Sequence, residues 1–235
     1  MTTAAPNKRG PYASSAKRRD VVSRAVLGLV DELGHDGVTT ALVSQRSGVG
    51  EATILYHFPS KDHLLVAALA RADDESAENS HAYAPEAVLD ARMLAETSGA
   101  TLETPRHRLF IMLKGQAATP GHPAAAYFAE RTVRQVKLFA DLITRSQQAG
   151  RMIPGLDPVA TARQVIAVWD GLAQMRVSDP TFDVEPLLED AVRRLTGQNL
   201  MAIHAMLGHS LAEPPSELRT TSSRAPASHE TLSLP

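Results

Sequence analysis

Residues 39–65 read TTALVSQRSGVGEATILYHFPSKDHLL, and this stretch decides the fold. Thr39 is a residue type that caps helices well, so it predicts a short helix over residues 40–47. Gly50 can cap the next helix, expected over residues 51–58. The stretch therefore predicts short helices joined by a tight glycine turn.

A Gly-x-Gly before a helix can also cradle a phosphate. A dinucleotide-binding fingerprint needs a strand before its glycines and a third glycine for helix packing. Here a capped helix precedes Gly48, and Thr53 occupies the place of the third glycine. A Walker loop would need Gly-Lys-Ser/Thr, which does not follow. The remaining interpretation is a helix-turn-helix whose second helix can enter the major groove of DNA.

The composition favours an all-α protein. The 235 residues are 43% hydrophobic and only 4% aromatic, and a chain rich in Ala and Leu prefers helices to strands. The chain has no cysteine, which excludes disulfides, thiolate zinc sites and cysteine nucleophiles. No apolar run approaches the roughly 18 residues of a membrane span, and no signal-peptide core follows the N-terminal basic residues. We therefore expect a soluble, cytoplasmic protein that does not meet a membrane.

Charge is distributed unevenly along the chain. The whole sequence has a net charge of −2, but residues 1–30 contain six Lys or Arg side chains and a single acid, Asp20. Such an asymmetry suggests an N-terminal part that meets a polyanion. A solvated basic arm without a partner explains the charges equally well.

Further helices are expected from apolar periodicity and from the Gly and Pro residues between them. Their expected ranges are 17–34, 85–98, 105–118, 123–149, 158–178 and 184–196, with a shorter apolar stretch over 199–208 and a long helix capped by Ser60. The expected organisation is a flexible basic arm (1–16), a three-helix helix-turn-helix domain (17–61), a larger helical effector-binding and dimerisation domain (62–210) and a disordered tail (211–235).

The stretch 39–65 resembles the helix-turn-helix of the tetracycline-repressor (TetR) family of bacterial transcription regulators. In that family Gly50 would be Ser, a slightly better cap, and Leu55 would be a tyrosine that donates to a DNA phosphate. The neighbouring Tyr56 is a position from which some relatives reach the DNA backbone. The residues that carry the resemblance are Thr39, Val43, Gly48, Val49, Thr53, Ile54, His57, Phe58, Pro59, Ser60, Lys61, Leu64 and Leu65.

The resemblance implies a DNA-reading role for the helix over residues 51–58. Ile54 and Phe58 share one face and should be buried, so the other face meets DNA. Glu51 would accept from cytosine N4 and Ala52 would touch a thymine methyl, although Glu51 could equally be a carboxylate stabilised by the helix dipole. The full set of expected DNA contacts is Thr39, Glu51, Ala52, Thr53, Tyr56, His57, Lys61, Arg18 and Arg19, with a hydrogen-bonded core histidine as the alternative for His57.

The resemblance also implies a homodimer that binds a palindromic operator and a small-molecule effector. The penultimate and last helices would form the dimer, through Val165, Ile166, Trp169, Leu172, Leu188, Ala191, Val192 and Leu195. Candidates for the effector pocket are Phe110, Gln116, Tyr127, Phe128, Trp169 and Met175. The dimer residues form two apolar stripes, which can as well be core. The pocket candidates combine apolar walls with a few polar tips, as small-ligand sites require, and each of them can also be a core residue.

An enzyme is not expected. No Gly-x-Ser-x-Gly elbow or Ser-His-Asp order occurs, no cofactor motif remains, and the histidine spacings do not place two metal ligands on one helical face. The family resemblance implies a ligand-responsive regulator, and because most members of that family are repressors, we expect repression. The alternatives are a helical DNA-binding module without an effector and a small-molecule binding protein that does not bind DNA.

Overall fold

The computed structural model describes residues 11–212, and this part of the chain is helical and has no strand. The all-α prediction is therefore confirmed. A 3₁₀ turn at His81–Tyr83 separates the first four helices from the rest. The α-helices, in chain order, are α1 (Pro11–Leu33), α2 (Thr40–Ser47), α3 (Glu51–His57), α4 (Lys61–Glu78), α5 (Ala91–Gly99), α6 (Pro105–Gln116), α7 (Pro123–Gln148), α8 (Pro158–Ser178), α9 (Val184–Thr196) and α10 (Gln198–Ala212).

The predicted caps position α2 and α4. The Thr39 hydroxyl accepts from the Leu42 N–H at 3.3 Å, and the Ser60 hydroxyl accepts from the His63 N–H at 3.4 Å. Both satisfy backbone donors that a helix start leaves unpaired. Gly48 ends α2 with φ +69°, in the left-handed region that glycine adopts without strain. Local sequence signals therefore set the spacing between α2 and α3.

Several predicted boundaries were wrong. α1 begins at Pro11, not at residue 17, because proline is tolerated at the first helical position. α5 begins at Ala91, not at residue 85, because the Asp90 carboxylate caps it by accepting from the Met93 N–H at 2.9 Å. α10 runs on to Ala212, into the predicted tail. The rest of the predicted arm and tail, 1–10 and 213–235, lies outside the described residues.

The N-terminal helices form a head around one hydrophobic core. Val26 of α1, Val43 of α2, Ile54 of α3 and Leu65 of α4 are all buried and belong to one cluster. Burying such side chains contributes roughly 1.5–3 kcal/mol each. The core therefore fixes the orientation of α3, which is too short to be stable alone.

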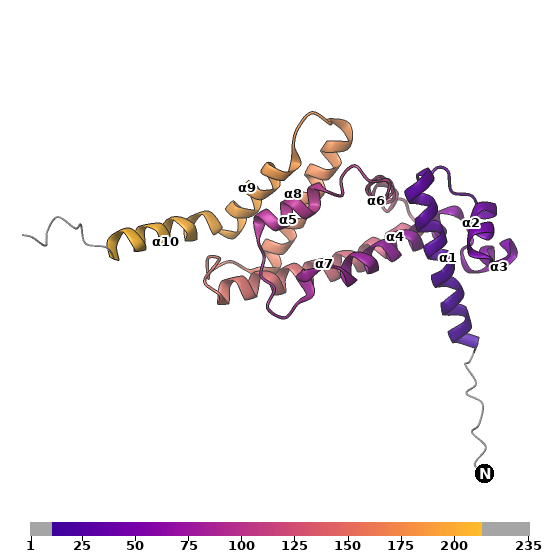
Figure 1. The fold of residues 1–235 in the computed structure, drawn as a ribbon, viewed down its shortest axis with the longest axis horizontal. Coiled ribbons are helices and arrows are strands. Elements are labelled where there is room, and N and C mark those ends of the chain that lie inside the picture. The colour runs from indigo at the N-terminus through magenta and orange to yellow at the C-terminus, as the bar shows by residue number, and fades with distance from the viewer. Residues whose placement is uncertain (1–10, 213–235) are drawn as a thin grey trace, which may run out of the picture.

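The remaining helices form a body whose α6 packs on α1 and α4 and whose α7 packs on α4, so the head core continues into α6 and α7 (Figure 1). In the body, α7 packs on α8, and α9 packs on both α5 and α8. A second core lies between them, with Ile143 of α7, Val165 of α8 and Leu188 of α9. α10 extends from the end of α9 that lies far from the head (Figure 1). No helix in the described part of the chain is long and apolar enough to cross a membrane.

Candidate nucleic-acid interface and effector region

α3 buries one face in the head and presents the other to solvent. Ile54 and the following Phe58 are buried, as predicted. Glu51, Ala52 and Tyr56 are exposed, and Tyr56 is exposed to 80%. The predicted DNA-facing side of α3 is therefore available, except that Thr53 is only half-exposed.

Lys61 lies at the start of α4, beside the turn that follows α1. Its Nζ donates to the Asp36 carbonyl oxygen at 2.8 Å. An ammonium has three donors, so two remain for a phosphate. The hydrogen bond orients the side chain, which was not foreseen from the sequence. Thr39, the other predicted phosphate contact near this turn, is exposed while its hydroxyl caps α2.

Arg19 and His57 lie together in a groove between the head and the body. The Arg19 guanidinium lies over the Phe58 ring at 5.1 Å, and the half-buried His57 ring contacts Tyr56 edge-on at 5.1 Å. The groove has a volume of about 480 Å³ and continues to Tyr127 of α7. Arg18 is exposed and does not line it. The geometry thus favours a packing role for His57 over a fully exposed DNA contact.

An ion pair that sequence reasoning missed holds α2 on α1. The Arg46 guanidinium donates to both carboxylate oxygens of Glu32 at 2.6 and 2.8 Å. This hydrogen bonding lowers the pKa of the Glu32 carboxyl. The pair joins the first helix of the helix-turn-helix to α1 at the surface, while the buried Val26 and Val43 pack the two helices together. No local pattern connects residues fourteen positions apart, so only the fold reveals the pair.

Polar bridges connect the head to the body. Arg106 of α6 donates to Asp31 of α1 at 2.7 and 2.8 Å and to Glu75 of α4 at 3.0 Å. A second network joins α4 to α7, where Asp73 accepts from Tyr127 at 2.5 Å and from Arg131 at 2.9 Å. Burial first, and then the charge of Asp73, raise the pKa of the Tyr127 phenol.

Four of the predicted effector-pocket residues pack together with His107. The five rings, which we call the aromatic cluster, are those of His107, Phe110, Tyr127, Phe128 and Trp169. Phe110 lies 5.4 Å from Phe128 and 5.6 Å from Trp169, and Tyr127 lies 5.0 Å from Phe128, all between ring centroids. Gln116 follows on α6, and its buried side-chain oxygen has no partner within the described residues. Met175 is 59% exposed.

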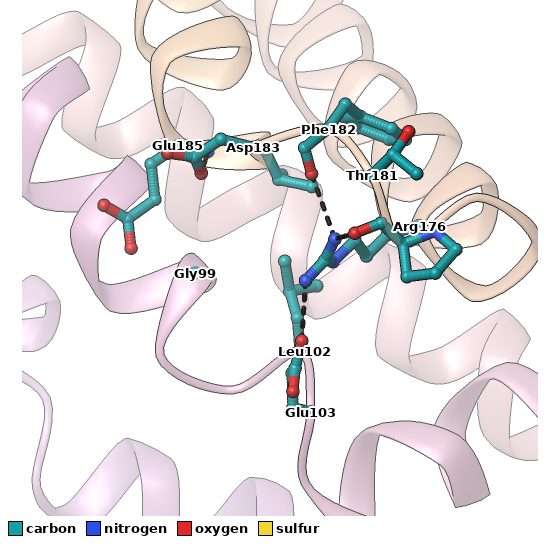
Figure 2. Close-up of a pocket in the computed structure, with 10 residues that line it drawn as sticks. Gly99, Leu102, Glu103, Arg176, Thr181, Phe182, Asp183 and Glu185 are labelled. Carbon is teal, nitrogen blue, oxygen red and sulfur yellow. Dashed lines mark hydrogen bonds and ion pairs between the residues drawn. The ribbon is translucent and has the colours of Figure 1, made fainter.

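A separate cavity of about 320 Å³ lies between the end of α5 and the α8–α9 loop (Figure 2). Arg176 crosses it and donates to the Phe182 carbonyl at 3.1 Å and to Glu103 at 2.6 Å. The Arg176 charge is thus already paired within the chain. None of the predicted effector residues lines this cavity. Among the described residues no group of three or more His, Asp or Glu is placed to hold a metal ion.

Part of the predicted dimer surface lies in the protomer's own core. Val165, Leu188 and Val192 are buried in the second core, so their assignment to the interface was wrong. A pattern of apolar residues gives the buried face of a helix but not the element that covers it. The other predicted interface residues, Ile166, Trp169, Leu172, Ala191 and Leu195, are half-buried, and Leu187 of α9 is 48% exposed.

Comparison of the sequence with known proteins connects this geometry to a family. Residues 27–68 match the model for the N-terminal domain of bacterial regulatory proteins of the tetR family. The chain is 29% identical over 216 residues to the HTH-type transcriptional repressor KstR of Mycolicibacterium smegmatis, covering 84% of this chain and 97% of that protein. It is 28% identical over 208 residues to KstR of Mycobacterium tuberculosis, covering 82% and 86%. The match thus includes both head and body.

Solved structures have the same fold. A TetR-family transcriptional regulator from Rhodococcus sp. superposes with a TM-score of 0.59 at 23% identity, covering 77% of this chain and 99% of that one. The multidrug binding protein EbrR complexed with ethidium superposes with a TM-score of 0.53 at 27% identity, covering 76% and 98%. Both are similar to this chain in the order of a small helical head and a larger helical body.

Proposed function

We propose that this chain, a member of the tetR family of bacterial regulatory proteins, is a transcriptional repressor that binds a palindromic operator as a homodimer and releases it when a small molecule binds. The observation that carries the proposal is α3. This helix is fixed by Ile54 and Phe58 in the head core, and its outer face, with Glu51 and Tyr56, is open to solvent. The relatives named KstR are transcriptional repressors.

The outer face of α3 would lie in the major groove. Glu51 and Ala52 would approach base edges, since N-terminal residues of a recognition helix reach deepest. Tyr56 and Lys61 would contact phosphates on either side and fix the register. Thr39 and Arg18 would add backbone contacts at the edge of the head. His57 and Arg19 would act mainly by holding α3 against α1.

A homodimer would place its two recognition helices on half-sites about 34 Å apart, one turn of DNA. The half-buried residues of α8 and α9, with exposed Leu187, are the surface that we propose for this contact. An effector in the body would favour a dimer with a different separation of its heads. The cytoplasm, where bacterial DNA lies, would be the site of action.

The experiment is fluorescence anisotropy with labelled DNA from the region upstream of the protein's own gene, against a scrambled duplex, at two salt concentrations. Selective binding that weakens with salt supports the repressor, because released counterions drive phosphate contacts. Equal weak binding to all upstream fragments contradicts it and favours a small-molecule binding protein. Selective binding that no metabolite extract reverses favours a DNA-binding module without an effector.

Tyr56 provides the matched variants. Tyr56→Ala is expected to weaken operator binding, because it removes the most exposed aromatic side chain of α3 without touching the core. Tyr83→Ala, which removes a tyrosine exposed to 58% in the 3₁₀ turn of the body, is the control and should bind operator normally. Equal binding by both variants would contradict the placement of α3 on DNA.

A further inference from the structure

α10 is an apolar helix whose side chains the protomer leaves uncovered. Its 15 residues, Gln198–Ala212, contain no Asp, Glu, Lys or Arg. Leu200, Ile203 and Leu207 are exposed to 62%, 53% and 57%, and within the protomer α10 packs mainly on α9. A helix this short is marginal alone in water, and a helix without a charged face is usually buried. The described part of α10 therefore presents an apolar surface that another element has to cover.

The exposed side chains of α10 form one seam. Leu200, Ile203 and Leu207 follow one another at intervals of three and four residues, which places them on one face of the helix. The same spacing marks the apolar positions at which helices pair in coiled coils. We call these three residues the α10 seam. Ala202, which is also exposed, lies on the opposite face.

The junction between α9 and α10 holds α10 away from the body. Gly197 turns the chain with φ +68°, in the left-handed region that glycine adopts without strain. A Cβ at Gly197 would collide with the side chain of Ile153, which packs on this turn. The Gln198 side-chain amide donates to the Leu89 carbonyl oxygen at 3.0 Å. The direction in which α10 leaves the body (Figure 1) is therefore fixed by contacts on two sides of the turn.

Neither the rest of the chain nor a membrane matches α10. The residues that follow it, 213–235, are mostly polar or Pro, and their only large apolar residues are Leu218, Leu232 and Leu234. Helices that lie on a membrane surface carry Lys and Arg on their polar face, and α10 has neither. At about 1.5 Å per residue α10 spans roughly 22 Å, which is too short for a hydrocarbon core of about 30 Å.

A second copy of this chain matches the α10 seam in charge and in extent. The copy presents the same uncharged seam, and a two-fold axis pairs identical surfaces, so no charge is buried unpaired. Three side chains are fewer than the roughly 20–30 residues that each partner contributes to a stable interface. However, α10 follows directly on α9, whose partly exposed Leu187, Ala191 and Leu195 recur at intervals of four residues. The two helices together offer a longer apolar surface than either alone.

We propose that α10 is a dimerisation helix whose seam packs on the α10 seam of a second copy, in addition to the α8–α9 contact. The proposal rests on the proposed function, because it adds a contact to the homodimer proposed there. α10 leaves the body at the end far from the head (Figure 1). The paired α10 helices therefore hold the two protomers together while the heads change their separation.

The first test compares a charge on the α10 seam with a charge on the opposite face of the same helix. Ile203→Glu places a carboxylate in the seam, and the two-fold axis places it there twice, so the dissociation constant of the dimer should rise about hundredfold or more. Ala202→Glu should change this constant by less than about threefold, as surface substitutions do. Analytical ultracentrifugation over a dilution series gives both constants, and circular dichroism reports the helical content.

The second test locates α10 in the dimer. The sequence contains no cysteine, so a single introduced thiol has no competitor. Ile203→Cys, in the middle of the α10 seam, should be linked into covalent dimers by a short bismaleimide. Val133→Cys, at a residue of α7 that is 71% exposed, should not. Neither variant introduces a charge, so this test holds even if Ile203→Glu loosens α10.

An unchanged dissociation constant in Ile203→Glu would overturn the proposal. Absence of cross-linking in Ile203→Cys would also overturn it and would place α10 on another surface. Sedimentation of the unaltered protein with phosphatidylglycerol vesicles, abolished by Ile203→Glu, would replace the second copy by a membrane.

Operator binding is measured separately by anisotropy. Cross-linked α10 helices in a protein that does not bind DNA selectively would refute the repressor but leave the α10 contact standing. A dimer that binds operator and that Ile203→Glu leaves intact would refute the α10 contact but leave the repressor standing.

Discussion

Arg106 of α6 binds Asp31 of α1 through two hydrogen bonds, from Nε at 2.8 Å and from a terminal nitrogen at 2.7 Å. The other terminal nitrogen donates to Glu75 of α4. The hydrogen bond to Asp31 is the largest of the effects that raise the pKa of Arg106. Bidentate pairs of this kind fix geometry as well as adding energy. One side chain of the body therefore sets the position of both long helices of the head.

Arg106→Ala should uncouple the head from the body. The pair is partly exposed, so we expect a loss of only about 1 kcal/mol in the free energy of unfolding, measured by urea denaturation. The larger effect should be on regulation, with operator binding retained but no longer reversed by effector. Arg92→Ala, which breaks an exposed pair with Glu96 on α5, should leave regulation intact. Normal release by effector in Arg106→Ala would show that another contact transmits the signal.

Lys61→Ala should weaken binding to all DNA sequences alike. Lys61 would neutralise one phosphate, so its removal should reduce the slope of log affinity against log salt by about one. The measurement is anisotropy on operator and scrambled duplexes over a range of salt. Lys137→Ala, on an exposed part of α7, is the control for a general loss of positive charge. An unchanged salt slope would remove Lys61 from the phosphate contacts.

Glu51→Ala should relax sequence preference at one operator position. A glutamate that accepts from cytosine N4 contributes about 1–3 kcal/mol of discrimination there, while its removal also lessens repulsion of phosphates. Affinity for operators mutated at that position should therefore approach the affinity for the native operator. Binding to a set of single-base variants checks this. If the variant keeps the full preference and only the thermal stability falls, Glu51 acts through the helix dipole instead.

The sequence predicted the head better than the body, for a physical reason. Caps such as Thr39 and Ser60 act within three residues of themselves, so α2 and α4 began where local signals placed them. The cap Asp90 is also local, but the acid was not recognised, and α5 was misplaced. Contacts between distant residues, such as Arg46 with Glu32, have no local signal at all. The apolar stripe that contains Val165 belongs to the core because α9 packs over it, and the sequence of α8 alone does not specify which element covers the stripe.

Leu187→Glu should dissociate the proposed dimer. Leu187 is exposed on α9, next to the buried Leu188, and a buried charge at an interface centre is strongly unfavourable. Light scattering after gel filtration should give the mass of a single protomer, which is half the mass of the dimer. Circular dichroism should show that the helical content is unchanged. The control is Val133→Glu on α7, at a residue that is 71% exposed. A Leu187→Glu protein that stays dimeric would move the interface elsewhere on the body.

His107 should make stability depend on pH in a way that His107→Phe does not. Burial lowers the pKa of the folded imidazole below its unfolded value near 6.5. As pH falls below about 6.5 the unfolded chain therefore binds a proton that the folded chain excludes, and the free energy of unfolding decreases by at most about 1.4 kcal/mol per pH unit. Urea denaturation at pH 7.5 and 5.5 should show a smaller decrease for His107→Phe than for the unaltered protein. Equal decreases would mean that His107 takes up its proton in the folded state as readily as in the unfolded one.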